Sequence, residues 1–466
     1  MAGGGGLEQC GAAIFCGGRS RRMGADKALF LVDGAGRGLL AALAGELAGR
    51  FGRVFLVTDD RRKLAAAAEL RRFPQVEDLR PGSGPVGALL TALSHCPDRP
   101  VFVLACDMPA IDWALVGRLK ELLDSTGAAA ALPRHGERPE PLCAFYGPGA
   151  APVFARGLAE GRLAVRENFP DLKPAFLDLP ERIEASGAAF INLNAVAEAR
   201  RAGFSLLGLA DRPVRRAGPD GAPGPAEERP MLVETSFDLV VDGAVIFSQT
   251  ALPPHLADLA RGLLLARGLI RGAADLADLV VSENRRRVEV QLKHPPAGEP
   301  PAGEPPEAKP PPGTAPAGAS RPPLKPRELL DLVEEFEGRS SPWRAAGATD
   351  RAWFAAPGGA GRRPAPVFED LTPLAALDKA IGRLLISGDD PAGGLLLTSG
   401  RADEATIRRA IRAGAGGLIA GWPPTTAAID LARAAGLFLA APAAAGTLAI
   451  HAGAERLPAR PELSRE

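Results

Sequence analysis

The sequence lacks several features that mark particular classes of protein. No apolar run approaches the roughly 20 residues that a membrane-spanning helix needs. Met1–Gly6 has neither the basic nor the apolar region of a secretion signal. Lys+Arg and Asp+Glu number 55 each, so no bulk charge of one sign draws the chain to nucleic acid. These absences predict a cytoplasmic protein that binds neither membranes nor nucleic acid.

Cysteine is scarce and confined to the first third of the chain. The spacing of the five cysteines matches neither a disulfide framework nor a zinc site, so we expect most of them to be small buried side chains. They are Cys10, Cys16, Cys96, Cys106 and Cys143. The remaining two thirds of the chain therefore has no thiol chemistry available.

At 466 residues the chain is too long for one hydrophobic core, and two or more domains are expected. Two stretches rich in proline and glycine interrupt the periodic pattern. Residues 209–230 read as a flexible linker, and residues 295–325 as an insertion that favours extended polyproline II. We therefore expect domains over residues 8–208 and 231–460, the second carrying the insertion.

Short apolar runs alternate with helical patterns in both blocks. This alternation predicts α/β domains, the first with a parallel sheet covered by helices on both faces. Ligands of such sheets bind beyond the carboxyl ends of the strands. The expected strands are 12–16, 53–58, 101–106, 128–133, 393–401 and 416–421, and the expected helices are 38–50, 86–94, 113–123, 403–413 and 425–435.

A basic, glycine-rich loop, GGRSRRMGADKALF (Gly17–Phe30), follows the first expected strand. Paired glycines let the backbone approach a phosphate closely. Neither a Walker motif nor a dinucleotide-binding fingerprint is present. We interpret the segment as a triphosphate-binding loop of another kind, with a basic surface turn as the alternative. Its cations are Arg19, Arg21, Arg22 and Lys27.

The loop resembles the signature of the molybdenum cofactor guanylyltransferases, which read approximately LAGGxSxRMGxDKxL. The resemblance implies a Rossmann-like nucleotidyltransferase sheet. Phe15 and Cys16 stand where the family has Leu-Ala, and they would contribute mainly backbone. The paired glycines favour the guanylyl enzymes over their cytidylyl relatives. The nucleotide-binding residues implied here are Phe15, Cys16, Gly17, Gly18, Arg19, Ser20, Arg21 and Lys27.

Three later segments match the same family in order. Val76–Leu93 contains Asp78 and a Gly-Pro-x-Gly turn, and the resemblance implies that Asp78, Gly84 and Gly87 contact the nucleotide. The other two are the strand end FVLACDMP, with Asp107, and the closing element FINLN, with Asn192 and Asn194.

Asp107 ends an apolar strand, where a carboxylate suits a cation better than the core. We predict that it binds Mg²⁺, with a helix N-cap as the alternative role. Asn194, or else Asn192, would orient the metal ion or a phosphate. We expect Lys27 and Arg22 to act in catalysis with Asp107 by neutralising phosphate charge.

The resemblance implies transfer of GMP from GTP to the phosphate of molybdopterin, with release of pyrophosphate. The nucleophile is already an anion, so no strong general base is needed, and we expect neither His95 nor His135 to be catalytic. The loop Arg134–Leu142 is placed to face the pterin. Alternatives are a cytidylyltransferase, a non-catalytic cofactor carrier and a sugar-phosphate nucleotidyltransferase.

The second block resembles the formate dehydrogenase accessory sulfurtransferases over Val233–Ile270 and, in order, over three segments between Glu369 and Ala441. That family carries sulfur on a Cys-x-x-Cys pair, which is absent here. The resemblance implies a retained scaffold that binds the cofactor or an apo-molybdoenzyme, such as formate dehydrogenase, without sulfur transfer. Arg401 reads equally as a helix cap or as a phosphate contact.

Overall fold

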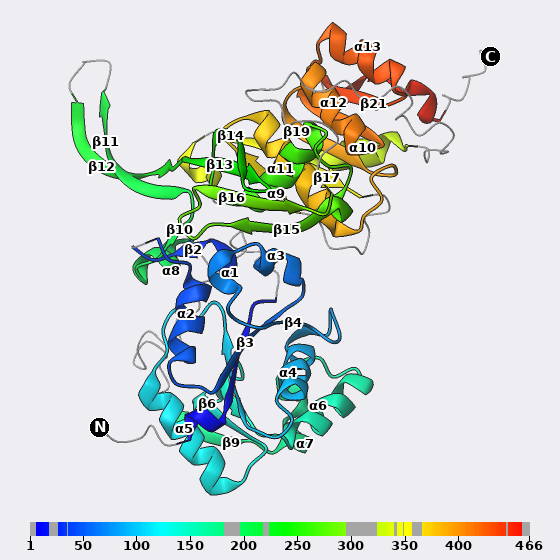
Figure 1. Ribbon diagram of the computed structural model, residues 1–466. Helices are drawn as coiled ribbons and strands as arrows, with labels where there is room; N and C mark the ends of the chain where they lie inside the picture. The colour runs from blue at the N-terminus through cyan, green and yellow to red at the C-terminus, as the bar shows by residue number, and fades with distance from the viewer. Residues whose placement is uncertain are drawn as a thin grey trace. The chain divides into compact units, whose positions relative to one another are not determined.

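The computed structural model divides the chain into two compact units, Met1–Leu207 and Gly208–Glu466 (Figure 1). It describes residues 6–17, 27–34, 36–180, 196–217, 223–294, 324–339, 343–347, 349–356, 366–443 and 446–458. Gly18–Asp26, which includes Arg19, Ser20, Arg21 and Arg22, lies outside these ranges, as do Asn192 and Asn194 and most of the proline-rich insertion.

An eight-stranded sheet forms the first unit, in the order β4-β3-β1-β5-β8-β6-β7, with β9 beside β6. Its strands are β1 (Gly11–Phe15), β3 (Arg53–Thr58), β4 (Gln75–Glu77), β5 (Val101–Ala105), β6 (Ala130–His135), β7 (Arg138–Pro139), β8 (Cys143–Tyr146) and β9 (Ala175–Leu179). The predicted α/β class is confirmed. The sheet is parallel from β4 to β5, but β8 runs antiparallel to β5 and β6. Only seven residues, 136–142, separate β6 from β8, too few for the crossover that a parallel pair requires.

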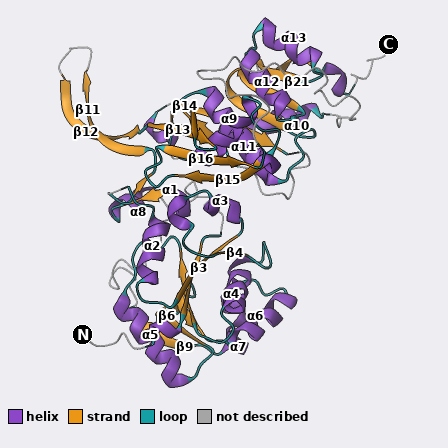
Figure 2. Cartoon of the chain, viewed as in Figure 1, coloured by secondary structure: helices purple, strands orange, loops and turns teal. Residues whose placement is uncertain are grey.

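Helices cover both faces of this sheet (Figure 2). On one face, α4 and α6 pack over a core that includes Phe55, Val103 and Phe154. On the other, Phe51 stacks on Phe102 with ring centroids 5.7 Å apart. The longer helices are α2 (Leu39–Ala48), α4 (Gly84–His95), α5 (Trp113–Thr126) and α6 (Ala150–Ala159). The short elements are α1 (Lys27–Phe30), β2 (Leu31–Val32), α3 (Arg61–Ala65), α7 (Phe169–Leu172), α8 (Val196–Arg201) and β10 (Ser205–Leu206).

The segment 209–230, expected to be a flexible linker, is instead a two-stranded antiparallel hairpin. β11 (Leu209–Ala217) pairs with β12 (Pro223–Leu232) over most of its length. Proline lacks an amide donor, but each strand of a lone pair has one open edge where no donor is needed. Pro213 and Pro230 are therefore compatible with this hairpin, although their density suggested a coil.

The second unit contains two larger sheets besides the β11–β12 hairpin. The four-stranded sheet has the order β14-β13-β16-β15, and the six-stranded sheet the order β18-β17-β19-β20-β21-β22. The strands are β13 (Thr235–Val241), β14 (Ala244–Ala251), β15 (Leu276–Val281), β16 (Arg287–Leu292), β17 (Asp350–Ala355), β18 (Phe368–Asp370), β19 (Leu395–Arg401), β20 (Gly417–Trp422), β21 (Phe438–Ala443) and β22 (Thr447–Ala452). β19, β20 and β21 are parallel, with α12 (Glu404–Arg412) and α13 (Thr426–Ala434) as crossovers. The predicted α/β pattern is thus confirmed in this unit as well.

Helices α9 (Leu256–Ala266) and α11 (Pro373–Ser387) make an unusually close contact in the second unit. A Cβ atom on Gly262 would lie 2.0 Å from the carbonyl oxygen of Asp378, and one on Gly382 would lie 1.8 Å from that of Asp258. Each glycine thus lies against the backbone of an aspartate on the other helix. The remaining helix of this unit longer than a few residues, within the described ranges, is α10 (Pro326–Gly338).

Candidate active site

The carboxyl ends of β1, β3 and β5 meet where the basic loop begins. Phe15, the last residue of β1, pairs with Val57 and Ala105. The amide of Cys16 donates to the Val57 carbonyl at 2.8 Å, and Gly17 follows so close to Asp59 that a Cβ atom would lie 3.6 Å from the Asp59 nitrogen. The side chains of Phe15 and Cys16 are buried. Only their backbone is available to a ligand, whereas Gly17 is exposed.

Asp107 lies in the turn directly after β5, half-buried beside this loop. The amide of the preceding Cys106 donates to the Phe15 carbonyl at 3.2 Å, which ties the turn to β1. The N-cap of the following helix is Asp112, whose Oδ1 accepts hydrogen bonds from the Ala114 and Leu115 amides at 3.0 and 3.1 Å. The alternative role of Asp107 as a helix cap is therefore excluded, and its carboxylate stays at the edge of the sheet where ligands bind.

Asp78 follows β4, and a close helix approach determines its position. Its amide donates to the Thr58 carbonyl at 2.9 Å, and its Oδ1 accepts from the Thr91 hydroxyl of α4 at 3.1 Å. A Cβ atom on Gly87 would lie 3.3 Å from that same Oδ1. Gly87 is thus needed for α4 to approach Asp78. Within the described residues, Oδ2 of Asp78 accepts no hydrogen bond.

Gly84 begins α4 with a φ of 61°, a left-handed conformation that favours glycine. Pro85 follows at the first turn, and Ser83 gives the helix no side-chain cap. The exposed start of α4 therefore lies beside the loop that carries Asp78.

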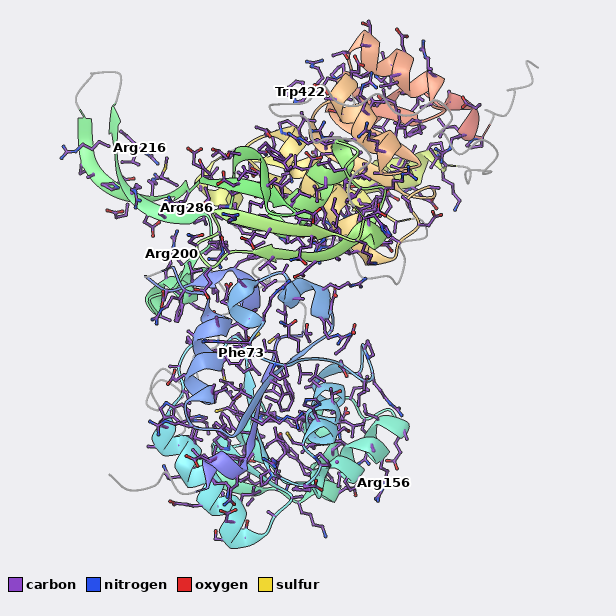
Figure 3. All side chains as sticks on the ribbon, viewed as in Figure 1. Phe73, Arg156, Arg200, Arg216, Arg286 and Trp422 are labelled. Carbon is purple, nitrogen blue, oxygen red and sulfur yellow. The ribbon has the colours of Figure 1, made fainter. Side chains whose placement is uncertain are left out.

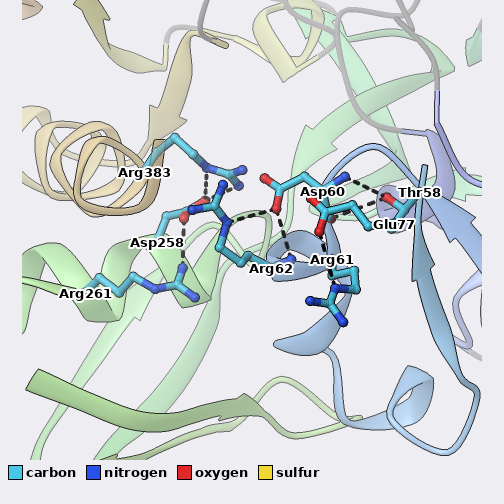
Figure 4. Close-up of polar contacts among 8 residues, drawn as sticks. All are labelled: Thr58, Asp60, Arg61, Arg62, Glu77, Asp258, Arg261 and Arg383. Carbon is cyan, nitrogen blue, oxygen red and sulfur yellow. Dashed lines mark hydrogen bonds and ion pairs between the residues drawn. The ribbon is translucent and has the colours of Figure 1, made fainter. Parts of the chain in front are cut away.

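Polar contacts fix the loop after β3 (Figure 4). The Asp60 amide donates to the Thr58 hydroxyl at 3.2 Å, and Asp60 Oδ1 accepts from the amide and Nε of Arg62 at 3.0 and 3.1 Å. Arg61 forms an ion pair with Glu77 at 3.5 Å. These contacts hold the chain that neighbours Gly17.

Sequence reasoning missed Glu140, a carboxylate in the segment that leads into β8, whose first residue Cys143 pairs with Leu104 at the end of β5. Burial raises the pKa of Glu140; His135 and Arg166 oppose this, and the negative charge of Asp107 adds to it. The loop Arg134–Leu142 was expected to face the pterin, but no residue in it was singled out. The sequence does contain a signal for Glu140, because this carboxylate stands in the segment PEPL (residues 139–142) directly before an apolar strand.

The structure thus brings part of the predicted site together. Phe15, Cys16, Gly17, Asp78, Gly84, Gly87 and Asp107 all lie at or beyond the carboxyl ends of the parallel strands. Lys27 begins α1, but its side chain lies outside the description, as do Gly18–Arg22 and Asn194. In the described part of the chain, no three His, Cys, Asp or Glu side chains are grouped to hold a metal ion.

His95 and His135 have structural contacts. Nε2 of His95 lies 2.9 Å from Nη2 of Arg53, and its ring lies 4.8 Å from that of Phe55. Nδ1 of His135, which is 2% exposed, lies 2.7 Å from the Pro180 carbonyl oxygen. These contacts agree with non-catalytic roles.

In the second unit, Asp378 and Lys379 of α11 form buried ion pairs. Lys379 Nζ lies 2.7 Å from Asp370 Oδ2, and neither side chain is exposed. Arg409 Nε donates to Asp378 Oδ1 at 2.9 Å. These residues hold α11 in place and are not accessible to a ligand.

Arg401 does not cap a helix. The N-cap of α12 is Asp403, whose side chain accepts from the Thr406 amide, whereas Arg401 donates to the Pro423 carbonyl. Arg401 is exposed at the end of β19.

A groove lies at the carboxyl ends of β19 and β20, with a volume of about 220 Å³. Its lining includes Phe336, Arg351, Ser399 and Trp422. Trp422 pairs with Arg401 across the two strands and is 60% exposed (Figure 3). The lining thus combines the aromatic Trp422 with one cationic and one anionic side chain, Arg351 and Glu337, at the sheet edge where ligands commonly bind.

Comparison with known proteins gives a separate match for each unit. Residues 12–168 match the MobA-like NTP transferase domain, and residues 232–458 match the FdhD/NarQ family. The first unit is a nucleotidyltransferase. In the described part of the chain, none of the helices has the length and apolar character needed to cross a membrane.

Individual relatives agree. A probable molybdenum cofactor guanylyltransferase of Methanothermobacter thermautotrophicus is 33% identical over 29% of this chain and 69% of its own length. One of Pelotomaculum thermopropionicum is 32% identical over 40% and 89%. The sulfur carrier protein FdhD of Corynebacterium efficiens is 28% identical over 45% of this chain and 83% of its own. The chain therefore belongs to the molybdenum cofactor guanylyltransferase family through its first unit, and its second unit is an FdhD-like domain.

Proposed function

We propose that the first unit transfers GMP from GTP to the phosphate of molybdopterin and releases pyrophosphate. The observation that carries this proposal is the position of Gly17, Asp78 and Asp107 just beyond the carboxyl ends of β1, β4 and β5, which belong to the parallel part of one sheet. The names of the relatives support molybdopterin and a guanine nucleotide as substrates.

Each described residue has a distinct role in this proposal. The Cys16–Gly17 backbone starts the loop that would enclose the triphosphate, continued by Gly18, Arg19, Ser20 and Arg21. Asp78 and the exposed start of α4, at Gly84 and Gly87, would hold the nucleoside. Lys27 and Arg22 would stabilise the charge on the phosphates as pyrophosphate departs.

Enzymes of this family generally depend on a divalent metal ion. We propose Mg²⁺ held by Asp107, with Asn194 completing the site. The fit rests on the chemistry of Asp107, whose carboxylate offers hard oxygen ligands just after β5 and does not cap α5. A bound Mg²⁺ would neutralise charge on the substrate phosphates. One protein carboxylate plus substrate oxygens suits this ion, so the lack of a three-residue cluster among the described residues is compatible with it.

We propose that the second unit receives the cofactor or docks an apo-molybdoenzyme without transferring sulfur. It contains no cysteine, which excludes a persulfide on the domain itself. Exposed Arg401 and the groove beside Trp422 support cofactor binding over a purely structural role.

The test combines purified protein, molybdopterin and Mg²⁺ with either GTP or CTP, and quantifies pyrophosphate and the dinucleotide. GTP should give product, and Asp107→Asn should lower the rate by at least about 100-fold, because a metal contact to the reacting phosphates is lost. Asp98→Asn, an exposed aspartate elsewhere in the unit, is the matched control.

Two other outcomes would change the assignment. Product from CTP alone would make the protein a cytidylyltransferase. Cofactor binding without product from either nucleotide would contradict catalysis and favour a carrier. A nucleotidyl-transfer rate in Asp107→Asn equal to that of the wild type would contradict the proposal that Asp107 binds Mg²⁺.

A further inference from the structure

Glu140 lies on the side of the site opposite Asp78. In the sheet, β4 and β3 lie on one side of β1 and β5, and β8 and β6 on the other. Asp78 follows β4, Asp107 follows β5, and Glu140 lies between β7 and β8, three residues before the start of β8. If the nucleotide occupies the β4 side, the second substrate must approach Asp107 from the side of Glu140.

The sheet fixes the backbone around Glu140. Its amide donates to the Pro133 carbonyl of β6 at 3.0 Å, and its carbonyl accepts from the Cys143 amide at 3.3 Å. The Leu142 carbonyl accepts from the Ala105 amide of β5 at 2.9 Å. Three bonds thus tie this short segment to the strands beside it, which is the preorganisation that a specific site requires.

The carboxylate of Glu140 has no partner of its own. It is half-buried, yet within the described ranges it accepts no hydrogen bond and forms no ion pair within 4 Å. A partly desolvated carboxylate is unfavourable unless donors satisfy it. A ligand that presents N–H donors would supply them.

Arg166 places a donor beside Pro139, the residue that precedes Glu140. It lies in a 3-10 turn (Val165–Asn168), its Nη2 is 3.4 Å from the Pro139 carbonyl oxygen, and its charge acts on Glu140. A guanidinium supplies N–H donors, and a carboxylate supplies two acceptor oxygens. A 2-amino-4-oxopyrimidine ring presents the complementary edge: an oxo oxygen, a ring N–H and an amino group.

We propose that Glu140 and Arg166 bind the 2-amino-4-oxo edge of the acceptor pterin and select it against pteridines that lack the 2-amino group. This inference rests on the proposed function, which makes a pterin the acceptor. Glu140 acts as a specificity-determining residue, and Arg166 binds the oxo group that both kinds of pteridine share.

The test measures binding of two fluorescent probes to the full-length protein: 6-hydroxymethylpterin monophosphate and the matching lumazine, in which an oxo group replaces the 2-amino group. The wild type should bind the pterin at least about tenfold more tightly, since lumazine lacks the amino group that would donate a charge-assisted hydrogen bond to Glu140. Glu140→Gln should abolish this preference, and Arg166→Gln should weaken both probes alike. Glu137→Gln, exposed in the same loop, is the control.

Binding without catalysis separates this inference from the proposed function. A wild type that prefers the pterin but makes no dinucleotide would support the recognition role while the proposed reaction fails. Retained preference in Glu140→Gln would overturn the inference. Loss of Mn²⁺ binding in Glu140→Gln, with pterin affinity unchanged, would also overturn it and would make Glu140 a metal ligand. An altered preference of this variant for GTP over ITP would overturn it too, because it would place Glu140 at the nucleotide base.

Discussion

At the scale of single residues, His255 couples the stability of the second unit to pH. It caps α9 with a φ of 63°, and its Nδ1 lies 3.3 Å from Asp258 Oδ2. Burial lowers the pKa of His255 to about 4; the hydrogen bond to Asp258 opposes this shift, and Arg383 and Lys379 add to it. The folded state therefore holds this imidazole neutral at pH values where the unfolded chain protonates it.

The sign of the pH effect follows from this difference. Between about pH 6.5 and pH 4 the unfolded state binds a proton that the folded state does not, so stability falls as the pH drops through this window. We expect His255 to contribute a loss of roughly 2 kcal/mol between pH 7 and pH 4, measured by urea unfolding. His255→Asn, which tolerates the left-handed conformation, should flatten that dependence. His294→Asn, at an exposed histidine, should leave it unchanged; an equal effect of both variants would contradict the prediction.

The ion pairs of Asp258 with Arg261 and Arg383 show why such contacts are hard to predict from the sequence alone. Burial by itself would raise the pKa of this carboxyl, but Arg383, His255 and Arg261 together lower it well below its usual range. Arg261 and Arg383 reach it at 3.0 and 2.7 Å (Figure 4). Arg383 comes from α11, so no spacing along α9 could have shown the pair.

At the scale of elements, the contact between α9 and α11 depends on Gly262 and Gly382. We expect Gly382→Ala to destabilise the second unit by about 3 kcal/mol, because the new methyl group would overlap the Asp258 carbonyl and force the helices apart. Chemical unfolding of the full chain measures this. Gly117→Ala in α5 is the control, since nothing lies within 4 Å of its Cβ position. That variant should gain about 0.5–1 kcal/mol from helix propensity; a neutral Gly382→Ala would disprove the close approach.

The sequence predicted the regular elements of both sheets better than their connections. β3 was expected over the residues that form it, and α12 and α13 end within a residue of the expected helices. Long apolar runs and helical periodicity carry these signals locally. The sequence did not predict the hairpin β11–β12. A high content of proline and glycine indicates that a segment has no buried face, but it does not indicate whether the segment pairs with a second exposed strand.

At the scale of the whole molecule, each unit has its own sheets and its own core. We therefore expect fragments 1–207 and 208–466 to fold separately, each with a single cooperative thermal transition. The first fragment should keep the nucleotidyltransferase rate of the full chain. Aggregation of either fragment, or loss of its transition, would show that it needs the other; a mixture of the two fragments is the control for such dependence.

The sequence by itself determined the α/β class, the order of most strands and helices, and the family of each half. Apolar periodicity and a contiguous glycine-rich loop are local properties, visible in a short stretch of sequence without knowledge of its tertiary contacts. Only the tertiary structure decided that Asp112 and not Asp107 caps α5, that Asp378 and Lys379 are buried in ion pairs, and that the segment carrying Glu140 adjoins the end of β5. These facts depend on contacts between strands and helices that are distant in sequence. Such contacts are decided by how the elements pack, so the spacing of residues along the chain does not reveal them.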